Sequence, residues 1–157
     1  MPEYDDAFVI QKAVRMSIER TVGRLPAETG GLLGMQSGVI CAYYFDETAC
    51  STHNEYRPDI ETCERIINDI WLPEDVHFCG FVHSHTLDSV PSRSDEQYTR
   101  ALYDAVRLAD PAVECGFYSV IAIPAYQKTA FSLHPYRGVY SPDGEFVLMP
   151  IQLREVD

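Results

Sequence analysis

Three segments of the chain repeat apolar residues at helical spacing, which predicts three helices. The first covers residues 11–22 and ends before Pro26, which bars its continuation. The second begins after Pro58 and ends at Pro73, and the third starts near Ser92 or Ser94 and runs to about residue 108. The residues expected to face the core are Ile10, Val14, Ile18 and Val22 in the first helix, Ile60, Cys63, Ile67, Ile70 and Trp71 in the second, and Tyr98, Leu102, Ala105 and Ala109 in the third.

Short apolar runs bounded by glycine, proline or polar residues predict the strands. The expected strands cover residues 28–35, 39–45, 78–85, 117–123, 129–133, 138–140 and 145–153. Turn signals at residues 36–38 and 142–144 favour hairpins, and residues 47–57 are expected to form a polar loop. Because helices alternate with strands early and strands dominate later, we expect an α/β protein with a mixed sheet and helices packed against it.

The composition fits one globular domain over residues 1–157, with 46% apolar residues and no internal repeat or linker. No apolar run approaches the roughly 20 residues needed to span a bilayer. The acidic start of the chain lacks the basic residues of a signal peptide, so we expect a cytoplasmic protein.

The charge and the cysteines exclude further classes. Against 24 acidic residues stand 12 Lys and Arg, a net charge of −12 that would repel nucleic acids and anionic membranes. The five cysteines are odd in number and none is spaced Cys-x-x-Cys, which argues against a disulfide scaffold or a zinc ribbon. We expect reduced thiols, mostly buried.

The segment His83-Ser84-His85 carries the chemistry of greatest interest. Residues i and i+2 of a strand face the same side, about 7 Å apart along the chain, so the two imidazoles could converge on one cation. A nearby aspartate as third ligand would complete the open arrangement of a catalytic zinc. Alternatively, the histidines form a hydrogen-bonded pair at a strand edge, Ser92 caps the third helix, and Asp95 lies in its first turn.

Three motifs taken together resemble the JAMM signature. They are residues 26–34 (Pro-Ala-Glu-Thr-Gly-Gly-Leu-Leu-Gly), the His83-Ser84-His85 segment, and Pro91-Ser92-x-x-Asp95. Their order, the helix between them and the strand before the histidines also match this MPN-type (JAB) family of zinc metalloproteases and deubiquitinase-like isopeptidases. The resemblance covers residues 8–135 and implies a three-layer, cytidine-deaminase-like fold with a curved mixed sheet flanked by helices.

The same resemblance implies the roles of the site residues. Zinc would be held by His83, His85 and Asp95. Glu28 would act as the general acid/base toward the attacking water, and Ser92 would hold the oxyanion or orient that water. The chain departs from the family in having Thr86 in place of the usual proline, and in a gap of nine residues between His85 and Asp95, one fewer than usual. Shortening a loop by one residue costs little free energy, so we expect this difference to affect the fit of the substrate.

The function implied is hydrolysis of a peptide or isopeptide bond by a zinc metallopeptidase. The expected substrate is the C-terminal tail of a ubiquitin-like or sulfur-carrier protein, bound as an added strand. Two alternatives remain open at this point: a catalytically silent MPN-type scaffold or protein-binding module, and a zinc hydrolase of small amides.

Other candidate residues are expected to be structural. Asp88 could influence the zinc but is expected to be a solvated loop carboxylate, and His53-Asn54 could lie near the site entrance or in a polar loop. His77 and His134 are expected at the surface or hydrogen-bonded in the core. Cys79 precedes His83 by four residues, so we expect a core thiol on the same face of the strand, about 13 Å away.

Overall fold

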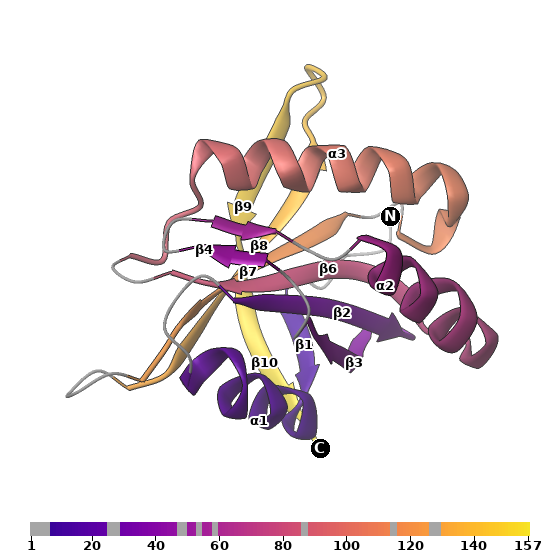
Figure 1. Cartoon of the computed structure of the whole chain (residues 1–157). Helices are drawn as coiled ribbons and strands as arrows, with labels where there is room; N and C mark the ends of the chain where they lie inside the picture. The colour runs from indigo at the N-terminus through magenta and orange to yellow at the C-terminus, as the bar shows by residue number, and fades with distance from the viewer. Residues whose placement is uncertain are drawn as a thin grey trace.

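The structure is a computed structural model, which describes residues 7–24, 29–46, 50–52, 55–57, 60–85, 88–113, 116–125 and 130–157. Its centre is an eight-stranded mixed sheet with the order β10-β1-β3-β2-β6-β7-β8-β9 (Figure 1). The strands of this sheet are β1 (Ala7–Gln11), β2 (Gly30–Gln36), β3 (Val39–Phe45), β6 (His77–Ser84), β7 (Phe117–Ile123), β8 (Ser132–Tyr140), β9 (Phe146–Pro150) and β10 (Gln152–Val156).

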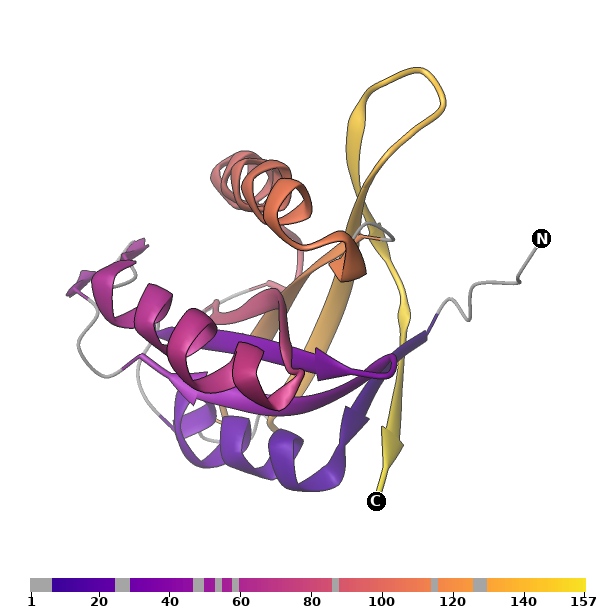
Figure 2. The same cartoon turned by 90° about the vertical axis from the view of Figure 1, so that its right-hand side faces the viewer.

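Helices cover both faces of the sheet. Helix α1 (Lys12–Arg20) packs on one face, where Val14 and Ile18 join the first buried cluster. Helices α2 (Ile60–Arg65) and α3 (Arg93–Ala109) lie on the other face, where Cys63 and Tyr103 join the second cluster. Figures 1 and 2 show these three layers, and the fold class predicted from the sequence is confirmed.

The sheet is strongly curved toward its C-terminal strands. Only Ile151 separates β9 from β10, yet β9 pairs with β8 while β10 pairs with β1 at the opposite edge. The backbone N–H of Ile151 donates to the carbonyl of Pro135 on β8 (3.2 Å). Figure 2 shows the two strands as one long bent ribbon, so consecutive segments of the chain form both edges of the sheet.

A β-bulge in β6 determines which of its side chains face which layer. Leu33 pairs with Gly80 and Gly34 pairs with Phe78, so Cys79 is an extra residue on β6. Cys79 and Val82 therefore lie in the cluster under α1, while Phe81 faces the other side and stacks on His83. The prediction that Cys79 is a core residue is confirmed, but its expected position on the face of His83 is wrong.

Several strands agree with the sequence prediction. Strands β3 and β7 have the expected bounds, and the hairpin between β8 and β9 turns at residues 142–144. The turn between β2 and β3 places Ser37 and Gly38 at φ values of 52° and 79°, the left-handed region that such two-residue turns require.

Other strands differ from the prediction. The expected strands at 129–133 and 138–140 both fall on one strand, β8, and the expected strand 145–153 is divided between β9 and β10. Strand β1 was not expected, because Ile10 was assigned to the first helix; Phe8, Val9 and Ile10 are all buried in a strand that runs parallel to β10. A continuous apolar run is typical of a strand covered on both faces, and it lacks the alternation of apolar and polar residues that indicates a half-exposed strand. Residues 47–57, expected to be a loop, include the short antiparallel strands β4 (Cys50–Thr52) and β5 (Glu55–Arg57).

The expected faces of two helices are partly wrong. Helix α2 continues into a π-helical turn (Ile66–Trp71) and a 3₁₀ turn (Leu72–Glu74), which rotate its face: Cys63 and Trp71 are buried, but Ile60 and Ile70 are 67% and 53% exposed. On α3, the buried residues are Thr99 and Tyr103, while Ala105 and Ala109 are exposed. Alanine is tolerated on either side of a helix, so the apolar pattern there was ambiguous.

The thiols and the membrane question can be judged on the described residues. Cys41, Cys63 and Cys79 form no disulfide, as expected, whereas the side chain of Cys50 and the whole of Cys115 lie outside the described part of the chain. Among the helices that the structure describes, none combines the length and the apolar character that crossing a bilayer would take.

His77, the first residue of β6, is hydrogen-bonded to the C-terminal end of α3. Its Nδ1 lies 2.6 Å from Asp110 at the C-terminus of α3, and its Nε2 lies 2.9 Å from Asp75. The hydrogen bond with Asp110 is the main reason why the pKa of His77 is raised, against the opposing effect of burial. His77 and His134, which contacts Ser132 (2.9 Å), are thus both hydrogen-bonded, as expected.

This contact predicts a pH dependence of stability. Because the folded state raises the pKa of His77, its contribution is fully present below the unfolded value of about 6.5 and is lost as the pH rises through the folded value. The loss of free energy of unfolding caused by His77→Gln should therefore be larger at about pH 6 than at about pH 9. Urea unfolding of both proteins at the two pH values measures this, and equal losses would contradict it.

Candidate metal centre

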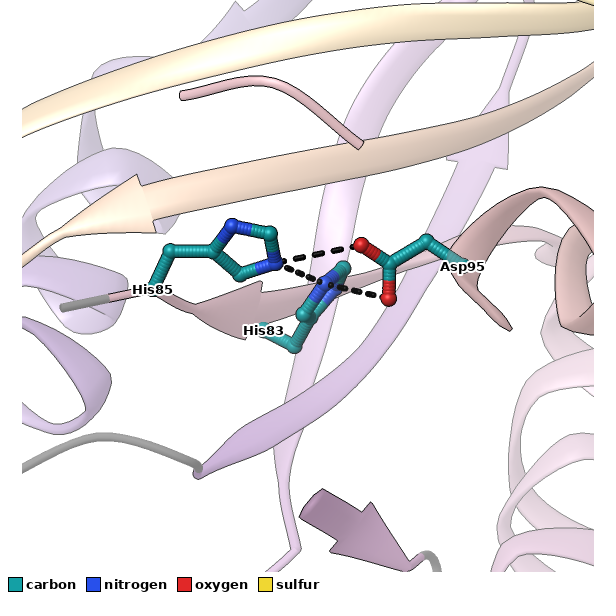
Figure 3. Close-up of side chains that lie close together, drawn as sticks. All are labelled: His83, His85 and Asp95. Carbon is teal, nitrogen blue, oxygen red and sulfur yellow. Dashed lines mark hydrogen bonds and ion pairs between the residues drawn. The ribbon is translucent and has the colours of Figure 1, made fainter. Parts of the chain in front are cut away.

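Two histidines and one aspartate converge where β6 ends and α3 begins. His83 is the penultimate residue of β6, His85 directly follows this strand, and Asp95 lies in the first turn of α3. Figure 3 shows the two imidazoles and the carboxylate pointing toward one another from these elements. Each offers one ligand atom, and the three atoms all lie within 4.8 Å of one another.

The distances between these atoms suit a small cation. Nε2 of His83 lies 3.0 Å from Nε2 of His85 and 3.1 Å from Oδ1 of Asp95, and Nε2 of His85 lies 3.1 Å from Oδ2 of Asp95. Ligands about 2.0–2.1 Å from a tetrahedral zinc lie roughly 3.3 Å from one another, so the arrangement fits that ion. The three donors also leave a fourth position for water or substrate.

The surroundings stabilise the ionised aspartate. Burial disfavours the charge of Asp95, but hydrogen bonds with His83 and His85 outweigh this effect and hold its pKa well below the usual range. His83 is itself buried, with its ring stacked on Phe81 at 5.4 Å. Its Nδ1 is buried too and has no hydrogen-bond partner among the described residues. Asp95 is therefore held in its ionised form, and the three side chains are largely shielded from water.

A capping box orients Asp95. Ser92 is the N-cap of α3: its Oγ accepts a hydrogen bond from the backbone N–H of Asp95 (3.1 Å), and its own backbone N–H donates to Oδ2 of Asp95 (2.8 Å). The expectation that Ser92 caps the helix is confirmed, and Ser94 does not take this position. Because the cap binds the same carboxylate that faces the histidines, it also directs that carboxylate into the site.

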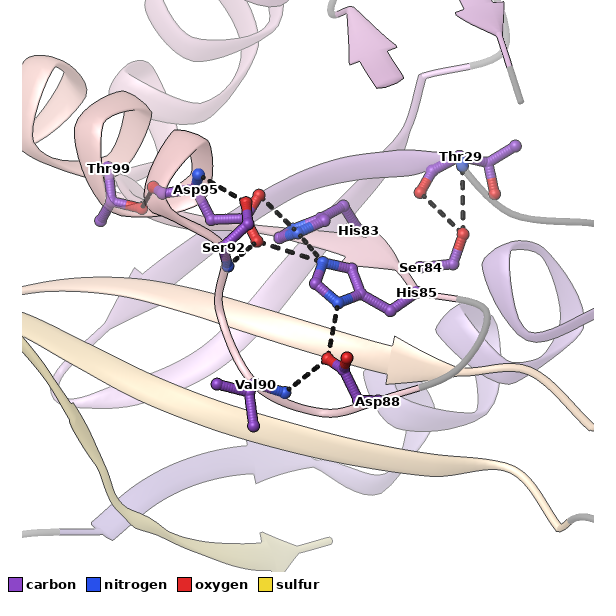
Figure 4. Close-up of polar contacts among 9 residues, drawn as sticks. All are labelled: Thr29, His83, Ser84, His85, Asp88, Val90, Ser92, Asp95 and Thr99. Carbon is purple, nitrogen blue, oxygen red and sulfur yellow. Dashed lines mark hydrogen bonds and ion pairs between the residues drawn. The ribbon is translucent and has the colours of Figure 1, made fainter. Parts of the chain in front are cut away.

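Residues 88–90, which precede Ser92, are held by two hydrogen bonds. Oδ1 of Asp88 accepts from the N–H of Val90 (3.1 Å; Figure 4). The Tyr136 hydroxyl donates to the carbonyl of Ser89 (2.6 Å). The Asp88 side chain is 69% exposed, as expected, yet its Oδ1 lies 3.7 Å from Nδ1 of His85. That separation is too long for a hydrogen bond, so Asp88 acts on His85 only through its charge.

Other residues predicted for the site lie outside the described part of the chain: Glu28, the expected acid/base, and Thr86 and His53-Asn54. Thr29 follows Glu28 directly, and the next residue, Gly30, pairs with His83 across β2 and β6.

Sequence reasoning missed a buried polar group on the same side of the sheet. Asp46 directly follows β3 and is buried, with the Cys63 thiol 3.7 Å from its Oδ2. Burial, followed by the charges of Cys63 and Asp46, raises the pKa of Tyr98 to about 12, and the Tyr98 ring packs edge-on against Phe81. The signal available in the sequence was the acidic pair Asp46-Glu47 at the end of an apolar strand.

Comparison with known proteins establishes the fold. No family model and no curated protein matches the sequence. Among solved structures, a protein from Desulfitobacterium hafniense, determined in solution, is similar with a TM-score of 0.64 and 17% identity, over 95% of this chain and 92% of its own. At that identity the likeness concerns the fold alone.

Two further solved structures carry the name of the family that the motifs resemble. A JAB1/MPN domain protein from Archaeoglobus fulgidus has a TM-score of 0.48 and 17% identity, over 95% of this chain and 98% of its own. A structure described as JAMM, a metalloprotease-like zinc site in the proteasome and signalosome, has a TM-score of 0.41 and 16% identity, over 96% and 98%. These likenesses are loose, so the reasoning about the site rests on its own residues.

The geometry predicts the metal stoichiometry. The purified protein should bind about one zinc per chain, because three suitable donors already stand at ligand spacing. The double variant His83→Ala/His85→Ala should lose that zinc, as measured by elemental analysis. His77→Gln, on the same strand six residues before His83, serves as the control and should retain it. Stoichiometric zinc in the double variant would exclude this site.

Proposed function

We propose that the chain is a zinc-dependent metallopeptidase that hydrolyses a peptide or isopeptide bond. The observation that carries this proposal is the convergence of His83, His85 and Asp95 on one point, with ligand atoms 3.0–3.1 Å apart. The supporting argument is the JAMM-like order of motifs, in which Glu28 and Ser92 accompany this metal set.

Each side chain has a separate task in this proposal. When bound, zinc would supply a Lewis acid that activates water and polarises the carbonyl. Glu28 takes a proton from the attacking water as the new C–O bond forms, and delivers it to the amine as the C–N bond breaks. Ser92 donates its hydroxyl hydrogen to the developing oxyanion, while its oxygen still accepts from the N–H of Asp95.

The proposed substrate is the C-terminal tail of a ubiquitin-like or sulfur-carrier protein. An extended tail can bind as an added strand through backbone hydrogen bonds, which makes no demand on a particular side chain. The net charge of −12 leaves nucleic acids and anionic membranes disfavoured as partners. A cytoplasmic location is part of the proposal, and the three described cysteines, which form no disulfide, suit a reducing compartment.

The first test separates metal binding from turnover. Glu28→Gln is nearly isosteric and should retain zinc, but hydrolysis of a ubiquitin-like protein carrying a C-terminal peptide extension should fall by about 10²-fold or more, because the proton shuttle is gone. Glu96→Gln changes an exposed glutamate of α3 and should remain active.

Each alternative function has its own outcome in this test. Zinc binding without hydrolysis of any tail or small amide would indicate a catalytically silent scaffold. Hydrolysis of small amides but of no tail would indicate a zinc hydrolase of small amides. Full activity of Glu28→Gln would show that another group is the base.

The second test concerns Ser92. Loss of the cap in Ser92→Ala should lower the free energy of unfolding by about 1 kcal/mol. If the hydroxyl also donates to the oxyanion, kcat should fall by about 10²-fold with little change in KM. Ser94→Ala, one residue inside the helix, should change neither quantity. Equal kcat values for the two variants would leave Ser92 a helix cap alone.

A further inference from the structure

The serine between the two histidines has a contact that the metal set does not explain. Ser84 is completely buried, and it is the last residue of β6. Because neighbouring side chains of a strand point to opposite faces, Ser84 points away from the site that His83 and His85 form. Figure 4 shows its hydroxyl directed at the backbone of Thr29.

Three contacts join Ser84 to Thr29. The backbone N–H of Ser84 donates to the carbonyl of Thr29 (2.9 Å), and the N–H of Thr29 donates to the Oγ of Ser84 (3.1 Å). The hydroxyl of Ser84 also lies 3.4 Å from the same carbonyl and donates to it. In an antiparallel pair the second N–H would donate to a backbone carbonyl, so here the side chain takes the place of that acceptor. We call this contact the Ser84–Thr29 clasp.

The clasp extends the pairing of β2 and β6 by one residue. The register pairs Gly30 with His83, and the clasp adds Thr29 opposite Ser84, directly beside the predicted acid/base residue. Thr29 directly follows Glu28 in the sequence, so the clasp fixes the backbone of the residue next to it. The metal ligands are held by other contacts: His83 pairs with Ile121, and the N–H of His85 donates to Ala122 (3.0 Å), both on β7.

We propose that Ser84 is a positioning residue, whose hydroxyl fixes the backbone of Thr29, the neighbour of Glu28 in the sequence, against the strand that carries His83. This inference rests on the proposed function, in which Glu28 transfers the proton. Proton transfer needs heavy atoms about 2.6–3.2 Å apart, and a misplacement of about 1 Å can cost 10²-fold in rate. Removing the hydroxyl leaves the N–H of Thr29 without its acceptor, which loosens this end of β2 but spares the contacts that His83 and His85 make with β7.

The first experiment needs no activity. Hydrogen exchange at the Thr29 amide, followed by NMR in the zinc-free protein, should be about tenfold faster in Ser84→Ala, because a buried hydrogen bond is lost. Ser84→Thr keeps a hydroxyl and should restore protection. Ser119→Ala is the matched control: this serine of β7 is equally buried, and its Oγ has no hydrogen-bond partner among the described residues. Unchanged exchange in Ser84→Ala would overturn the clasp.

The second experiment measures catalysis on the tail substrate. Ser84→Ala should lower kcat by about 10- to 10²-fold, with KM and zinc content unchanged, and Ser84→Thr should recover most of the rate. In the Glu28→Gln background, Ser84→Ala should cause no further loss, because the group that it positions is already disabled. A purely structural role predicts that Ser84→Ala lowers kcat by the same factor in the wild type and in the Glu28→Gln variant.

The outcomes separate this inference from the proposed function. An active wild type with wild-type kcat in Ser84→Ala, or with additive losses in the double variant, would overturn the positioning role alone. A wild type that binds zinc but hydrolyses no tail would overturn the proposed function and with it the catalytic purpose of the clasp. The exchange experiment would then still decide whether Ser84 holds Thr29.

Discussion

The carboxylate of Asp95 is the group on which the geometry of the candidate site depends. Its Oδ2 accepts a hydrogen bond from the N-cap of α3, and both of its oxygens face the imidazoles at the end of β6. One side chain therefore fixes where the helix begins and how it sits against the strand. Loss of the cap would disturb the metal set, and loss of the carboxylate would disturb the helix, so stability and metal binding are coupled at this residue.

Strand β6 supplies the other half of this arrangement. Strand β6, with its bulge at Cys79, contributes side chains to both buried clusters: Val82 lies in the cluster beneath α1, and Phe81 packs on the opposite face. His83 follows Phe81 on that second face and is stacked against it. The packing around Phe81 thus also restrains the ring of His83, which limits the conformational entropy that this side chain would lose when a cation binds.

The parts of the fold that could be predicted are those whose signal is local. Strands β3 and β7 are short apolar runs between turn residues, and the start of α3 follows from Ser92 and Asp95 at capping-box spacing. Strand β1 has its parallel partner near the other end of the chain, which no local pattern reveals. Which residues of α2 and its continuation face the core depends on a π-helical turn. The convergence of the histidines with Asp95 was indicated only by the resemblance of the motifs.

The chemistry of the three groups distinguishes a metal site from a purely structural cluster. Ser92 and Asp95 would benefit the helix without any ion, so their presence alone does not indicate catalysis. The two imidazoles are different, because their Nε2 atoms face each other at 3.0 Å while both also face the carboxylate. If both nitrogens carried a hydrogen, two N–H groups of like polarity would lie 3.0 Å apart; if only one did, the other nitrogen would direct a lone pair at a carboxylate oxygen. A dication would accept the lone pairs of all three groups at once, so the donor set suits a cation.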